Sequence, residues 1–131
     1  MKSTFKIKNW QLLKARGLEG KVTLPAGDFV AIGKRALAGK QNRYMESVVL
    51  PEGVSVIKAE AFAGGKNLRT VILFPLGNVG LSQGVFKGCT HLREVANSER
   101  INSIGAEAFA NCLAAYFDLD AAGEDRLFFR H

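Results

Sequence analysis

Cysteine, histidine and long apolar runs are all scarce in this sequence, and each scarcity excludes a class of protein. Two cysteines among 131 residues are too few to hold a small secreted domain together by disulfides. No apolar run approaches the roughly 20 residues that span a bilayer, so we expect no membrane insertion. The first residues alternate lysine with apolar side chains and lack the hydrophobic segment of a secretory signal. We therefore expect a protein that is cytoplasmic as encoded; export by another route, or origin as a fragment of a longer protein, stays open.

Residues that support catalysis are equally sparse. The two histidines, His91 and His131, are not tied to an acid or a nucleophile by a recognisable motif, so a catalytic triad has no support. Ser55 and Lys58 match the Ser-x-x-Lys spacing of serine acyl enzymes, but that motif belongs on a helix and these residues fall in an extended segment. No phosphate-binding glycine loop is present. The sequence therefore predicts no enzyme and no cofactor.

Metal binding fails on the number of ligands. A structural zinc site usually takes four ligands that include a close pair such as Cys-x₂-Cys, whereas Cys89 and Cys112 lie 23 residues apart. Residues 118–123 copy positions 1, 3 and 6 of a calcium-binding loop, but Phe129 occupies the position of its bidentate glutamate. We expect a solvated acidic turn in that segment, and no metal.

Charge is unevenly distributed along the chain. Residues 1–43 contain ten Lys/Arg and two acidic residues, for a net charge of +8, whereas residues 44–131 contain eight Lys/Arg and ten acidic residues, for −2. The basic segment is either a solvated face that keeps the protein soluble or a surface that attracts an acidic protein or nucleic acid. With 47% hydrophobic residues, the chain is apolar enough to form one domain around a buried core.

A motif of about two dozen residues recurs along the chain. Three sets of apolar residues repeat in the same phase: Phe62, Phe86 and Phe109; Ile57, Leu81 and Ile104; and Leu24, Leu50 and Leu73. Successive members are 23, 24 or 26 residues apart, and the one longer step fits an insertion around residues 40–44. This period lies within the range of leucine-rich repeats.

Each repeat has the pattern of one coil of a solenoid. Leu68, Val71 and Leu73 alternate with variable residues, as in a half-buried strand, and residues 54–57 form a second short extended piece. Residues 61–64, Ala-Phe-x-Gly, predict a tight helical or 3₁₀ turn that places an aromatic ring inside. Because only neighbouring coils can cover these inward groups, we predict about four stacked coils, made mainly of short β-strands with short helical or 3₁₀ turns. The three phenylalanines are expected to form one column.

The residues that carry the repeat also carry a family resemblance. The pattern Leu-Pro-Glu-Gly-Val-x-x-Ile-x-x-x-Ala-Phe-x-Gly-x-x-x-Leu at residues 50–68 resembles the bacterial surface-antigen (BspA-like) type of leucine-rich repeat. Residues 86–92 are similar to the Phe-x-Gly-Cys-x-x-Leu segment of that family, and residues 5–13 look like the hairpin that often precedes such repeats. The resemblance covers about residues 22–113. It implies a leucine-rich-repeat solenoid with a non-catalytic binding role, often at microbial surfaces. The fourth unit departs from the pattern, with Ala-Asn-Ser-Glu at residues 96–99 in place of Leu-Pro-x-Gly.

A stack of coils has two open ends that must be covered. We expect one domain, 1–131, with a hairpin cap at 1–21, about four repeats at 22–113 and a second cap at 114–131. The residues expected to cover the first coil are Phe5, Ile7, Trp10, Leu12 and Leu13. Those expected to close the last coil are Tyr116, Phe117, Leu119, Leu127, Phe128 and Phe129. A partner or dimer site at this second cluster is the alternative, and we expect a monomer or a weak dimer.

Cys89 and Cys112 occupy the same position in successive coils. Stacking brings their backbones to about 4.8 Å, which a disulfide can bridge, but parallel side chains are poorly aimed for one. We therefore expect two buried free thiols.

The exposed face of the strands is the predicted contact surface, because stacking aligns its residues from coil to coil. Arg69 and Arg93 fall in adjacent coils, and arginine is enriched among interface hot spots. The predicted partner-binding residues are Lys21, Thr23, Glu46, Ser47, Val49, Arg69, Thr70, Ile72, Arg93 and Glu94, with Ala96 beside them. We predict a non-catalytic module that binds a protein of unknown identity through this face. The alternative is a binder of nucleic acid or another acidic polymer that uses the basic N-terminal third.

Overall fold

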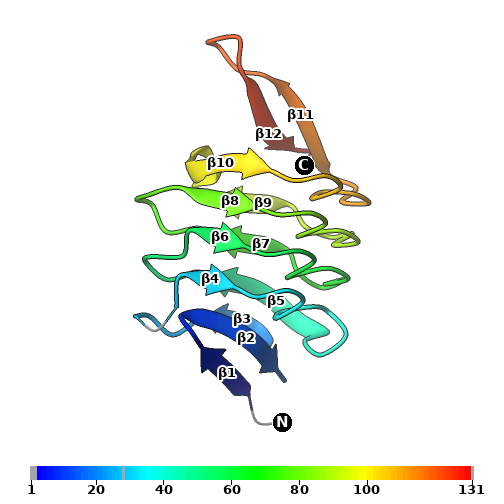
Figure 1. Cartoon of the computed structure of the whole chain (residues 1–131). Helices are drawn as coiled ribbons and strands as arrows, with labels where there is room; N and C mark the ends of the chain where they lie inside the picture. The colour runs from blue at the N-terminus through cyan, green and yellow to red at the C-terminus, as the bar shows by residue number, and fades with distance from the viewer. Residues whose placement is uncertain (1–2, 28, 131) are drawn as a thin grey trace.

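The structure, a computed structural model, describes residues 3–27 and 29–130 of the chain. The chain winds into a β-solenoid of about four turns, as the repeat predicts (Figure 1). His131, one of the two histidines considered above, lies outside the described residues. No helix in the described part of the chain has the length and apolar character needed to cross a membrane.

Two sheets form the sides of the solenoid. The six-stranded sheet has the order β1-β2-β4-β6-β8-β10, with β1 at Thr4–Lys8, β2 at Gln11–Arg16, β4 at Ala31–Ile32, β6 at Val56–Ile57, β8 at Val79–Leu81 and β10 at Ile101–Ile104. The four-stranded sheet has the order β3-β5-β7-β9, with β3 at Glu19–Thr23, β5 at Tyr44–Val49, β7 at Thr70–Ile72 and β9 at Glu94–Ala96. Consecutive coils pair in parallel in both sheets.

The core consists of columns of like side chains. In the four-stranded sheet, Val22, Val48, Val71 and Val95 lie in register, and the last three are buried. Phe62, Phe86 and Phe109 stack with ring centroids 5.3 and 5.4 Å apart. The predicted phenylalanine column is therefore confirmed, and it shows that each coil is covered by its neighbours.

The turn that carries each phenylalanine is not the short helix that the sequence predicts. Across residues 60–65, alternate N–H groups bond within the coil, as from Ala61 to Lys58 O, while those between them bond to the next coil, as from Phe62 to Val85 O at 2.9 Å. Glu60 and Gly64 also adopt left-handed φ of 56° and 74°, which a right-handed helix excludes. Stacking thus takes half of the donors that a helix would need.

In the described residues, the one 3₁₀ helix is η1 at Ser98–Arg100, in the unit that departs from the repeat pattern. Asn97 precedes it with a left-handed φ of 66°, and its Nδ2 donates to Leu73 O of the coil below at 2.7 Å. The substitution at 96–99 therefore replaces a Pro-x-Gly corner with a hydrogen-bonded helical corner.

The N-terminal segment forms the antiparallel hairpin β1–β2, and β2 then pairs in parallel with β4. Leu12 and Ala15 are buried, whereas Phe5 and Trp10 are 41% and 67% exposed. The expectation that Phe5 and Trp10 cover the first coil is wrong, because Phe5 lies on the edge strand and Trp10 lies in the hairpin turn with a left-handed φ of 61°.

The C-terminal segment forms a second hairpin, β11 (Ala115–Leu119) and β12 (Asp125–Phe129), which pairs with neither sheet and projects from the end of the stack (Figure 1). Phe117 touches Phe109 edge-on, with centroids 5.9 Å apart, and Leu127 and Phe129 pack against the core. Leu119 and Phe128 remain exposed. These residues cover the last coil only in part, because the hairpin turns outward after its first contacts.

Candidate functional site

The outer face of the four-stranded sheet carries the predicted contact residues in straight columns. Lys21, Ser47, Thr70 and Glu94 are in register across the four strands. The two end residues are exposed and the middle two are partly buried. The column therefore begins with a cation and ends with a carboxylate, with two hydroxyl groups between them.

A second column on the same face is more apolar. Thr23, Val49, Ile72 and Ala96 are in register, and the last three are partly buried in the chain itself. Because alternate residues of a strand point to one side, these two columns flank the inward valine column. The face thus combines hydroxyl groups with apolar side chains that are only partly covered.

The residues that directly precede Ser47, Thr70 and Glu94 form a third column. The N–H of Arg69 donates to Glu46 O at 2.8 Å, and the N–H of Arg93 donates to Arg69 O at 2.9 Å, so these three residues are stacked in successive coils. All three side chains are exposed. None of the ion pairs found in residues 3–27 and 29–130 involves them, which leaves both guanidinium groups available to a partner. The predicted contact residues therefore lie in three columns that run along the four-stranded sheet.

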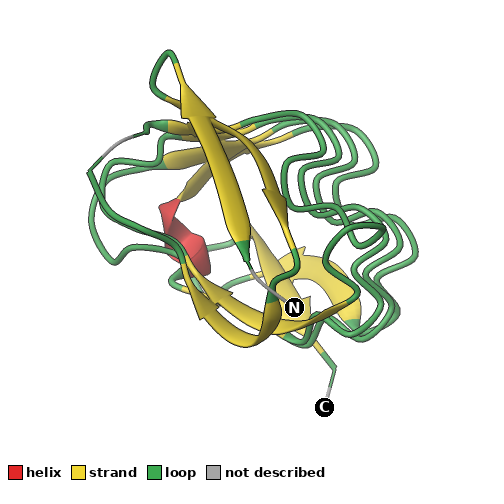
Figure 2. Cartoon of the chain, turned by 90° about the horizontal axis from the view of Figure 1, so that it is seen from below, coloured by secondary structure: helices red, strands yellow, loops and turns green. Residues whose placement is uncertain are grey.

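The phenylalanine turns connect the two sheets and stack at one side of the coils (Figure 2), where they carry a ladder of left-handed residues. Arg35, Glu60, Gly84 and Glu107 have φ between 56° and 63°, and backbone hydrogen bonds between coils place them at equivalent positions in four successive coils. Arg35 pairs with Glu60, Nη2 to Oε1, at 2.9 Å, and Lys87 pairs with Glu107, Nζ to Oε2, at 2.9 Å. The hydrogen bond to Lys87 and its charge lower the pKa of Glu107, and the same contact raises the pKa of Lys87.

The two cysteines are buried and free, as the sequence predicts. Each thiol donates to the carbonyl of the phenylalanine in the preceding coil, Cys89 to Phe62 O at 3.1 Å and Cys112 to Phe86 O at 3.0 Å. Burial raises the pKa of Cys89 to about 12 and that of Cys112 to about 11. Because the thiolate is the reactive form, burial disfavours reaction of both thiols in the folded chain.

The side chains considered for catalysis or metal binding are engaged elsewhere or isolated. The ring Nδ1 of His91 lies 2.8 Å from Lys66 O, and Ser55 Oγ donates to Val30 O at 3.4 Å. Asp120 accepts hydrogen bonds from N–H groups of its own hairpin turn and forms an ion pair with Arg126. Within the described ranges, no three His, Cys, Asp or Glu side chains gather as metal ligands do.

One buried polar residue was not anticipated from the sequence. Asn42 is 2% exposed; its Oδ1 accepts the N–H of Leu18 at 3.0 Å and its Nδ2 donates to Ala15 O at 2.9 Å. It joins the insertion in the first repeat to the chain that links β2 to β3. The irregular length of that repeat was the available signal, but length alone does not show which residue turns inward.

The model of the family described as "BspA type leucine rich repeat region (6 copies)" matches residues 20–122. The chain belongs to this family. No curated protein sequence and no solved structure matches the chain. BspA-type leucine-rich repeats are typically non-catalytic, and leucine-rich-repeat domains in general mediate protein–protein interaction. Membership therefore agrees with the resemblance carried by residues 50–68 and 86–92, and it directs attention to the surfaces of the solenoid.

Proposed function

We propose that this chain is a protein-binding module that holds a partner protein against the outer face of its four-stranded sheet. The observation that carries the proposal is the register of β3, β5, β7 and β9, which aligns exposed charged residues with partly covered apolar residues in continuous columns. Such a surface is fixed by backbone pairing before a partner arrives, so little conformational entropy is lost on binding.

Arg69 and Arg93 are the expected anchors of the interface. Arginine combines a planar donor fork with a stem that packs on apolar surface, and the partly buried Ile72 and Ala96 lie one coil apart on the same sheet. Neither arginine has an ion-pair partner in the part of the chain that the structure describes. A carboxylate of the partner therefore meets cations that need not first break an internal contact.

The first experiment maps the contact surface directly. A photo-crosslinking amino acid is placed at Thr70 or at Glu94, and, as a control, at the exposed Lys34 outside the sheet face. After irradiation in an extract of the source cells, both sheet positions are expected to crosslink to the same protein, and the Lys34 position is not. Equal crosslinking from Lys34 would show that the contact is not specific to the sheet face.

The second experiment tests the anchors. The double variant Arg69→Glu, Arg93→Glu is expected to recover the crosslinked protein at least about tenfold less than the wild type, the size of loss typical of hot-spot arginines. The matched control, Lys14→Glu with Lys34→Glu, makes the same change of charge at exposed positions off the face. Undiminished recovery by the Arg69 and Arg93 variant would contradict the proposal.

A further inference from the structure

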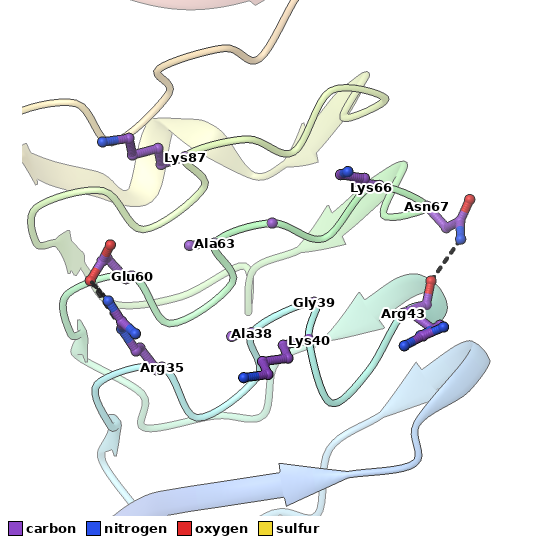
Figure 3. Close-up of a pocket in the computed structure, with 11 residues that line it drawn as sticks. Arg35, Ala38, Gly39, Lys40, Arg43, Glu60, Ala63, Lys66, Asn67 and Lys87 are labelled. Atoms are coloured by element: carbon purple, nitrogen blue, oxygen red, sulfur yellow. Dashed lines mark hydrogen bonds and ion pairs between the residues drawn. The ribbon is translucent and has the colours of Figure 1, made fainter.

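A groove of about 740 Å³ lies on the turn side of the solenoid, in the segments that connect the six-stranded sheet to the four-stranded sheet, across the first three coils (Figure 3). Its floor is formed by Ala38 and Gly39 of one coil and Ala63 and Gly64 of the next. We call this feature the turn-face groove. Its volume falls within the range of sites that hold ligands.

The turn-face groove exists because one repeat position is small in two successive coils. The N–H of Gly39 donates to Ala63 O, and the N–H of Gly64 donates to Lys87 O, so Ala38, Ala63 and Lys87 are equivalent positions. Two alanines leave the surface hollow and the exposed Lys87 closes one end. The floor is also tightly packed, because a Cβ at Gly39 would overlap the carbonyl of Gly64.

The walls of the turn-face groove are strongly basic. Five cations line it, Arg35, Lys40, Arg43, Lys66 and Lys87, against one carboxylate, Glu60, which gives a net charge of 5 − 1 = +4. Arg35 pairs with Glu60, and Lys87 pairs with Glu107 outside the groove. In the described ranges, Lys40, Arg43 and Lys66 take part in no ion pair, so three full cations face the solvent around a floor without side-chain charge.

We propose that the turn-face groove binds an extended acidic peptide segment of a protein. Complementary charge attracts such a segment, and the small floor lets its backbone approach closely. A peptide also brings backbone N–H donors. The carboxylate of Glu60 and Oδ1 of the exposed Asn67, both on the wall, can accept hydrogen bonds from them. Asn67 is held in place because its Nδ2 donates to Arg43 O at 2.7 Å.

Single-stranded nucleic acid fits the turn-face groove less well. Its binding sites rely on aromatic side chains on which bases stack, and no aromatic residue lines this groove. The sugar-phosphate backbone, unlike a peptide backbone, also offers no N–H donor to Glu60, which stands within the basic wall. The groove shares no lining residue with the proposed sheet-face interface, so different variants test the two proposals.

The test measures binding of a fluorescein-labelled octaglutamate peptide by anisotropy at low ionic strength. The triple variant Lys40→Glu, Arg43→Glu, Lys66→Glu is expected to weaken binding at least about tenfold. The matched variant Lys6→Glu, Lys14→Glu, Arg16→Glu alters total charge equally at exposed positions of β1 and β2 and is expected to change it less than about twofold. Equal losses in the two variants would overturn the proposal, since they would show attraction by net charge alone.

A steric variant tests the groove without changing charge. Ala63→Tyr fills the floor and is expected to weaken octaglutamate binding about tenfold or more, while Ala63→Ser leaves it unchanged. A large side chain should be tolerated there, because the equivalent residue in the next coil is Lys87. Circular dichroism is used to check that each variant folds. The sheet-face variant Arg69→Glu, Arg93→Glu is expected to bind the peptide like the wild type. Absent peptide binding, or tighter binding of an oligothymidylate octamer, would overturn the proposal.

Discussion

The two ends of the solenoid are closed by hairpins that work in different ways. At the N-terminal end, β2 continues the six-stranded sheet through parallel pairing with β4, and its residue Leu12 is fully buried. At the C-terminal end, β11 and β12 pair only with each other, and Phe117 remains 49% exposed. A hairpin that extends the hydrogen-bond ladder continues the six-stranded sheet beyond the first coil, whereas one attached by side chains alone leaves the outer edge of β10 unpaired.

The comparison predicts that one substitution has very different costs along the phenylalanine column. Phe86 is fully buried between two rings, so Phe86→Ala is expected to lower the free energy of unfolding by about 3–5 kcal/mol. Phe109, at the C-terminal end, is only partly buried, and Phe109→Ala is expected to cost about half as much. Urea denaturation of the two variants measures the difference. Equal losses would show that the C-terminal hairpin covers the last coil as fully as a neighbouring coil does.

The N-terminal end is predicted to depend on one amide. Asn42→Ala removes both partners of Leu18 N–H and Ala15 O, and an unsatisfied buried group costs about 1–3 kcal/mol. We therefore expect a loss of about 2–3 kcal/mol in urea denaturation. The control Asn67→Ala removes one exposed hydrogen bond and is expected to cost less than about 1 kcal/mol. Similar losses in both variants would contradict an anchoring role for Asn42.

The two thiols report on how easily each part of the stack opens. With pKa values raised to about 12 and about 11, Cys89 and Cys112 are almost entirely protonated near pH 8, so alkylation requires local opening. Cys112 lies in the last coil under the partial cap. We expect it to react about tenfold faster than Cys89, a difference of about 1.4 kcal/mol in opening free energy. Mass spectrometry of labelled peptides measures both rates, and faster reaction of Cys89 would reverse the proposed order of stability.

The sequence predicted the interior of this fold better than its edges. The spacing of Phe62, Phe86 and Phe109 sets the register of the whole stack, because each ring must meet the next. Local patterns failed where donors or side chains are shared between coils: residues 61–64 predict a helical or 3₁₀ turn, yet the next coil accepts alternate N–H groups of residues 60–65. The turn-face groove was missed for the same reason, since it appears only when Ala38, Ala63 and Lys87 are seen to be equivalent positions.

The exposure of Phe5 and Trp10 has a related cause. Their apolar character predicts burial, but a hairpin has one strand at the edge of the sheet and a turn beyond it, and these two residues occupy those places. Period-two alternation locates the inward side of a strand. It does not show whether another element covers that side, and at the ends of this solenoid the cover is incomplete.

The smallest predicted effect is confined to the C-terminal hairpin. Asp120 accepts Arg126 Nε at 2.7 Å and the N–H groups of Ala122 and Glu124 at 2.9 and 3.0 Å. The hydrogen bond from Arg126, followed by these N–H groups, lowers the pKa of Asp120 below its usual 3.8. A lowered pKa means that the contacts persist above the unfolded value and are lost as the pH falls through the folded value. We expect the amide resonances of Ala122 and Glu124 to shift in an NMR titration only below about pH 4.

The matched variants for this hairpin are Asp120→Asn and Asp118→Asn. Among residues 3–27 and 29–130, Asp118 accepts one hydrogen bond, from the N–H of Leu119, so its substitution should leave the resonances of Ala122 and Glu124 in place. Asp120→Asn, in contrast, should shift them even at neutral pH. Because β11 and β12 pair with neither sheet, the amides around Phe86 should not respond to either change. A shift there in the Asp120 variant would mean that the C-terminal hairpin is coupled to the coils as closely as the N-terminal one.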